Sequence, residues 1–162
     1  MGNNTANSVY IIAEAGVNHN GSPEVAEQMI YAAKKSGVDA IKFQTFNTDL
    51  LVTHSAPKAE YQGRNDSKSR ESQYTMLKKL ELDKSEYITL KKICAENHID
   101  FMSTPFDIDS IALLEEIGVD KYKAPSGEIT NYPYLVRLAE TNKPIILSTG
   151  NKKTGRYATC PR

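Results

Sequence analysis

Short runs of apolar residues alternate with segments of helical periodicity along most of the chain. The first run, at residues 9–13, lacks polar alternation, which is typical of a parallel strand that is buried on both faces. Such runs predict five strands, at residues 9–13, 40–45, 99–104, 121–124 and 144–148. Repeated strand–helix units favour a parallel sheet with right-handed crossovers, so the pattern predicts the α/β class. It is compatible with both a doubly wound sheet and a barrel.

The helices between these strands have recognisable start and stop signals. Ser22 followed by Pro23 is typical of a helix N-terminus, and Gly37 is typical of the position after a helix end. Asp83 and Glu86 resemble a capping box. Three further helices are predicted, at residues 71–80, 107–117 and 131–141.

A long polar segment follows the second predicted strand. It runs from Asn47 to about Arg70, whereas a loop between a strand and a helix usually has about 2–6 residues. Its position after a strand predicts an active-site lid.

Length and composition narrow the class of protein. The 162 residues support one domain, fewer than the roughly 250 of a complete (β/α)₈ barrel. The formal net charge of zero gives no electrostatic basis for binding nucleic acid. No apolar stretch approaches the roughly 20 residues of a membrane span, and no signal peptide is visible. We therefore expect a cytoplasmic protein, which also suits the two cysteines, Cys94 and Cys160.

Polar side chains lie at the carboxyl ends of the predicted strands, where parallel α/β proteins gather their sites. A lysine within a buried strand is unfavourable unless it meets an anion. Lys42 lies between Ile41 and Phe43, and Lys123 lies in a similar setting. With the hydroxyls nearby, the two lysines predict a cradle for a phosphorylated carboxylic acid. The candidate residues at the strand ends are Glu14, Lys42, Gln44, Thr104, Lys123, Ser126 and Ser148.

Other motifs point to ordinary structure. Asn20-Gly21 predicts a tight turn that leads into a helix. His19, His54 and His98 have no metal-ligand spacing. The chain contains neither the glycine-rich fingerprint of dinucleotide sites nor a P-loop.

Five segments resemble the strand-end motifs of the N-acetylneuraminate synthase family, which includes the legionaminic and pseudaminic acid synthases and the spore-coat polysaccharide synthase relatives. The segments are IIAEAGVNHNGS (11–22), KFQTF (42–46), FMSTPFD (101–107), KYKAPSGEITNYPYL (121–135) and PIILSTG (144–150). The resemblance implies that residues 1–150 are the first five or so βα units of a (β/α)₈ barrel. Residues 151–162 form an atypical tail, and the antifreeze-like C-terminal domain of the family is not expected in this chain.

The resemblance also implies a reaction. Family members condense phosphoenolpyruvate with N-acetylmannosamine or a related N-acetylated amino sugar, giving a nonulosonic acid and phosphate. They use Mn²⁺ or Mg²⁺, and the histidine ligands lie on later strands, so no metal ligand is expected in this chain. Full-length members are homodimers.

Roles for the candidate residues follow from the resemblance, residue by residue. Phosphoenolpyruvate would be held by Lys42, Thr104, Lys123, Ser126 and Ser148. Glu14 would lie near the reacting carbons, and Gln44 and Glu128 would face the sugar or the attacking water.

Two alternatives to the synthase remain open. One is a Schiff-base aldolase in which Lys42 or Lys123 attacks a carbonyl, and the other is a non-catalytic fragment that binds phosphoenolpyruvate. The change of character after Gly150 suggests a frameshift or a premature stop in the coding sequence. Because five strands cannot close an eight-stranded barrel, we expect uncovered sheet edges and a marginal or aggregation-prone product.

Overall fold

The computed structural model describes residues 9–54 and 72–150. In these residues the strands are β1 (Ile12–Gly16), β2 (Ala40–Thr45), β3 (Asp100–Pro105), β4 (Tyr122–Ala124) and β5 (Ile145–Leu147). The helices are α1 (Pro23–Lys35), α2 (Thr48–Leu51), α4 (Gln73–Lys78), α5 (Lys84–Glu96), α6 (Ile108–Ile117), the 3₁₀ helix η1 (Ser126–Thr130) and α7 (Tyr132–Glu140).

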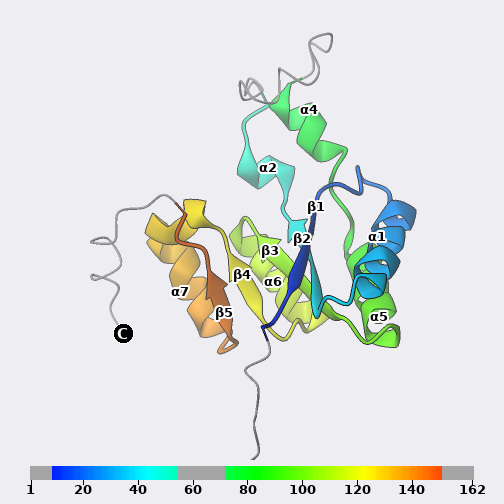
Figure 1. Cartoon of the computed structure of the whole chain (residues 1–162). Helices are drawn as coiled ribbons and strands as arrows, with labels where there is room; N and C mark the ends of the chain where they lie inside the picture. Colours follow the sequence, from blue (N-terminus) through cyan, green and yellow to red (C-terminus); the bar gives the residue numbers. More distant parts are fainter. Residues whose placement is uncertain (1–8, 55–71, 151–162) are drawn as a thin grey trace, which may run out of the picture.

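The strands are parallel and follow one another in the order of the sequence. β1, β2 and β3 form one sheet, and β4 and β5 form a second. β4 contacts β3, so the two sheets lie side by side (Figure 1). Each connection between successive strands contains a helix, which confirms the predicted α/β class.

One face of the strands is buried against the helices. Ile41 and Phe43 of β2 share a core cluster with Phe101 of β3 and Tyr122 of β4, and the Phe43 and Phe101 rings stack with centroids 5.8 Å apart. The helices contribute Ile30, Leu90, Ile111 and Leu138 to the same cluster. Since side chains alternate along a strand, the residues between these positions point to the opposite face.

The predicted helix signals are confirmed. The Asp83 carboxylate accepts from the Glu86 backbone N–H at 2.9 Å, and Glu86 accepts in return from the Asp83 N–H at 2.6 Å. Asp107 caps α6 by accepting from the Ser110 N–H at 2.7 Å. The helix predicted at residues 71–80 is present as α4.

The first strand begins later than predicted. Its ladder starts where Ile12 lies opposite Ala40, whereas Val9, Tyr10 and Ile11 are exposed. The Tyr10 ring lies under the Lys121 ammonium at 4.4 Å, outside the ladder. Prediction of residues 9–13 as a buried strand was therefore wrong in its boundaries, because apolar character does not reveal where pairing begins.

The last strand departs from burial in another way. Its apolar side chains are exposed. β5 pairs with β4 on one side and forms the edge of the described sheet. This agrees with the expected uncovered edge. The residues concerned are Ile145, Ile146 and Leu147.

Of the long polar segment, the structure describes residues 47–54, and α4 lies just after it. α2 and α4 lie over the carboxyl ends of β1 and β2 (Figure 1). The lid prediction falls mainly on residues 55–71, and the tail with Cys160 on residues 151–162, all of which lie outside the described residues. No helix in the described part of the chain is long and apolar enough to cross a membrane.

The predicted Asn20-Gly21 turn has a packing role beyond chain reversal. Asn20 and Gly21 both have positive φ, at 51° and 75°. A Cβ built on Gly21 would lie 2.0 Å from the carbonyl oxygen of Lys79, just after α4. Only a residue without a side chain permits this approach. The turn therefore packs directly against the end of α4.

Replacing Gly21 by alanine is expected to destabilise the fold more than replacing Gly37. Both glycines have nearly the same φ, 75° and 74°, so a strain of about 1–2 kcal/mol is common to the two variants. Nothing lies within 4 Å of a Cβ at Gly37. The excess loss in the free energy of unfolding of Gly21→Ala, measured in urea, reports the contact with Lys79. Equal losses would contradict this account.

Candidate functional site

Lys42 joins three neighbouring strands on the face opposite the core. Its register partners are Glu14 on β1 and Met102 on β3, and Gln44 lies opposite Thr104. The Lys42 ammonium is 2.5 Å from the Glu14 carboxylate and donates to the Thr104 hydroxyl at 3.1 Å. The Lys42 side chain is 10% exposed and that of Glu14 is 56% exposed. The buried ammonium thus has one anionic partner at the rim of the site.

Lys123 brings a second positive charge to this face from β4. Its ammonium donates to the Ser148 hydroxyl and, at 2.8 Å, to the carbonyl of Ala124. Burial lowers the pKa of Lys123, the charge of Lys42 lowers that pKa further, and Glu14 opposes the shift. The two lysines therefore interact electrostatically, and an anion between them would relieve their repulsion.

The remaining strand-end residues are only partly brought into this cluster. A Cβ built on Gly16 would lie 3.5 Å from both the Gln44 amide nitrogen and the Glu14 carboxylate, so these two side chains meet at Gly16. Ser126 lies against Gly150, just after β5. Glu128 instead accepts from the Asn131 amide at 2.6 Å, at the start of α7. Among the described contacts, none joins Glu128 to the lysines.

The histidines do not form a metal site with other ligands. His19 is fully buried, its Nδ1 accepts from the Gly21 N–H at 3.1 Å, and burial lowers its pKa. His54 lies with its ring centroid 4.1 Å from that of Tyr74. Within residues 9–54 and 72–150, no three His, Cys, Asp or Glu side chains gather as metal ligands would.

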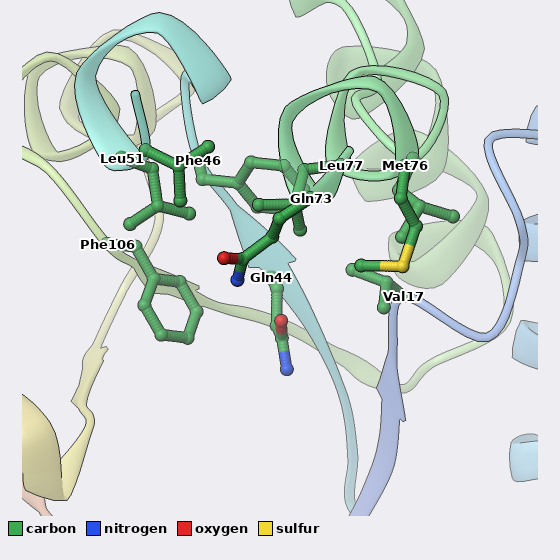
Figure 2. A pocket seen from close by; sticks show the side chains of 10 residues that line it. Val17, Gln44, Phe46, Leu51, Gln73, Met76, Leu77 and Phe106 are labelled. Atoms are coloured by element: carbon green, nitrogen blue, oxygen red, sulfur yellow. The ribbon is translucent and has the colours of Figure 1, made fainter. Parts of the chain in front are cut away.

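A pocket that the sequence did not reveal lies beside Gln44. It has a volume of about 640 Å³ and is bordered by the ends of β1 and β2, the residue before the cap of α6 and the helices α2 and α4 (Figure 2). Its lining residues are Val17, Gln44, Phe46, Leu51, Val52, Gln73, Met76, Leu77, Leu80 and Phe106. The apolar spacing of Met76, Leu77 and Leu80 in the predicted helix was the available signal, but it could not show which surface that helix covers.

Polar contacts hold the two helices of this pocket together. Asp49 of α2 accepts from the Tyr74 hydroxyl at 2.6 Å and from Lys78 at 3.2 Å, and both hydrogen bonds lower its pKa. Glu81 accepts from the Thr48 N–H at 2.5 Å and pairs with Lys78 at 2.8 Å. Burial alone would raise the pKa of Glu81, but these partners lower it.

The arrangement suits an anion with several oxygen atoms. Two ammonium groups and the hydroxyls of Thr104 and Ser148 offer donors on one face. Glu14 supplies a carboxylate next to them, and Gln44 separates this polar cluster from the apolar pocket. Such a site can bind a phosphorylated acid and place a second, less polar molecule against it.

Comparison with known proteins gives the family. The sequence model of the NeuB family matches residues 29–159. The chain belongs to this family.

Curated relatives share this part of the family sequence. The chain is 51% identical over 141 residues to the N,N'-diacetyllegionaminic acid synthase of Legionella pneumophila, covering 87% of this chain and 39% of that protein. It is 48% identical to the enzyme of the same name from Campylobacter jejuni, covering 90% of this chain and 43% of that protein. The chain thus spans about two fifths of the length of these NeuB relatives.

Solved structures extend the likeness to the fold. The N-acetylneuraminic acid synthetase of Leptospira borgpetersenii superposes with a TM-score of 0.77 at 33% identity, over 94% of this chain and 48% of that chain. A truncated 3-deoxy-D-arabino-heptulosonate 7-phosphate synthase from Thermotoga maritima superposes with a TM-score of 0.61 at 13% identity, over 93% and 44% of the two chains. The predicted class, parallel βα units that match part of a TIM barrel, is therefore confirmed.

We expect the free energy of unfolding of the wild type to rise at alkaline pH, and we expect this rise to be absent once the Lys123 charge is removed. The folded-state pKa of Lys123 lies below its ordinary value of 10.5. Its protonated form therefore opposes folding below the folded-state pKa, and the penalty fades as the pH rises from there towards 10.5. The free energy of unfolding of the wild type should therefore rise relative to that of Lys123→Met as the pH rises towards 10.5.

The matched control for this comparison is Lys92→Met, which removes an exposed lysine of α5. It gives the baseline for losing one positive charge. A pH profile of Lys123→Met that runs parallel to that of Lys92→Met would contradict the shifted pKa of Lys123.

Proposed function

We propose that this chain supplies the phosphoenolpyruvate-binding part of a nonulosonic acid synthase. The observation that carries the proposal is the pair of lysines on one face of the strands, with Lys42 held by Glu14 and Thr104 and Lys123 held by Ser148. Membership in the NeuB family and the names of the relatives support the same reaction class. The acceptor is an N-acetylated amino sugar.

Each group has a role in this proposal. The two lysines and the hydroxyls of Thr104, Ser126 and Ser148 bind the phosphate and carboxylate. The enol carbon C3 forms a bond to the aldehyde carbon of the sugar, water adds at C2, and phosphate leaves with its bridging oxygen by cleavage of the C2–O bond. Glu14 stabilises positive charge at C2 or moves a proton there. Gln44 and Glu128 orient the sugar or the water.

The divalent metal implied by the family does not fit the residues described. His19 is enclosed with Nδ1 occupied by the Gly21 N–H, and the described residues contain no cluster of ligands. We therefore assign no step of the reaction to a metal held by these residues. Homodimer formation and a cytoplasmic location stay predictions.

Replacement of Lys42 by methionine is expected to weaken phosphoenolpyruvate binding by about 10- to 100-fold, because one charge-assisted hydrogen bond is lost. Isothermal titration calorimetry of the 162-residue chain measures the change. Lys92→Met, with the same change of charge on α5, should bind as the wild type does. Pyruvate, which lacks the phosphate, should bind more weakly than phosphoenolpyruvate. Equal affinities of Lys42→Met and Lys92→Met would refute the cradle.

The Schiff-base alternative is favoured by one observation, the lowered pKa of Lys123, because a neutral amine is a better nucleophile. In that reaction the amine attacks the carbonyl of pyruvate, water leaves, and borohydride reduces the imine to a stable secondary amine. We expect no adduct by mass spectrometry after treatment with pyruvate and borohydride. An adduct that disappears in Lys123→Met would replace the synthase proposal with an aldolase.

A further inference from the structure

The apolar pocket opens next to the polar cluster and shares a wall with it. Gln44 lines the pocket, and its amide nitrogen lies against Gly16 together with the Glu14 carboxylate. Glu14 in turn pairs with Lys42. A molecule in the pocket would therefore lie beside whatever the lysines bind. The volume of about 640 Å³ is within the range of small-molecule sites, about 300–1,000 Å³.

The chemistry of the lining is selective. Among the lining residues that the structure describes, none is charged, and the side chains with strong hydrogen-bonding groups are the carboxamides of Gln44 and Gln73. Figure 2 shows Gln73 reaching from α4 towards the end of β2, with Met76 and Leu77 on the same helix above the pocket. A sugar ring or chain that carries only hydroxyls would find few partners here, and burying them without partners is unfavourable.

An N-acetyl group matches this lining better than a hydroxyl does. Its methyl group can pack against apolar side chains, and its amide N–H and C=O can pair with a carboxamide, which has both a donor and an acceptor. Resting on the proposed function, we propose that this pocket binds an N-acetyl group of the acceptor sugar. Gln73 is its specificity-determining residue, and Met76 packs against the methyl group.

The selectivity of the pocket depends on how α4 is held in the fold. α4 is tied to α2 through Asp49, Tyr74 and Lys78, and its end rests on Gly21. The contacts of α4 with α2 and with the turn at Gly21 therefore fix the place of the Gln73 backbone over the pocket without the sugar. Such preorganisation favours discrimination between closely related sugars.

Methionine methyl groups provide a direct test on the whole chain. Met76 lines the pocket, Met102 is the register partner of Lys42, and Met29 packs against the core from α1. With ¹³C-methyl methionine, N-acetylmannosamine should shift the Met76 resonance and leave Met29 unchanged. Mannose, which lacks the acetamido group, should bind at least about tenfold more weakly by the same resonance. Phosphoenolpyruvate should shift Met102.

Variants of Gln73 test its assignment. Gln73→Leu should weaken N-acetylmannosamine binding by about tenfold, and Gln73→Glu, which keeps the shape but loses the N–H donors, should also weaken it. Gln28→Leu, the same change at an exposed site on α1, is the matched control and should bind as the wild type does. An unchanged Met102 response to phosphoenolpyruvate shows that each variant is folded.

The possible outcomes separate the two proposals. If Met102 responds to phosphoenolpyruvate but Met76 does not respond to N-acetylmannosamine, or responds equally to mannose, the pocket assignment is overturned and the phosphoenolpyruvate site stands. If Met76 responds selectively but phosphoenolpyruvate has no effect, the pocket assignment stands and the proposed function fails. If neither resonance moves, both are overturned.

Discussion

Alternation of side chains along β2 is the constraint on which the rest of the molecule depends. Ile41 and Phe43 point to the helices and join the core, so Lys42 and Gln44 must point the other way. The parallel register then places Glu14 and Thr104 beside them. Burial of one face thus dictates which residues meet on the other, and the polar cluster follows from the packing of the core.

The charges on that face are not balanced, as they would be in a sheet with a purely structural role. Lys42 is nearly enclosed and has Glu14 as its carboxylate partner, whereas Lys123 is held by a hydroxyl and a carbonyl. Burial lowers the pKa of Lys123, and the charge of Lys42 lowers it further. Sites that bind anionic substrates commonly hold such charges in place at some expense in stability.

The helices over the strand ends place an apolar pocket next to the charged cluster. α2 and α4 cover an apolar pocket into which the described lining brings two carboxamides, Gln44 of β2 and Gln73 of α4. Contacts of Asp49, Lys78 and Glu81 hold the two helices together. Gly21 explains why the turn after β1 belongs to the same unit, since it allows the Lys79 carbonyl to approach. A polar cradle and an apolar pocket that share Gln44 can accept two chemically different molecules side by side.

The sequence by itself determined the α/β class, the helix caps and the residues at the strand ends, because these depend on local periodicity and on contacts within a few residues. The Asp83 capping box and the lysines in apolar strands are of this kind. Tertiary structure alone decided that Tyr10 lies outside the ladder and that α4 covers a pocket over Gln44. Each of these depends on contacts between segments distant in the chain or on competing partners, which no local pattern encodes.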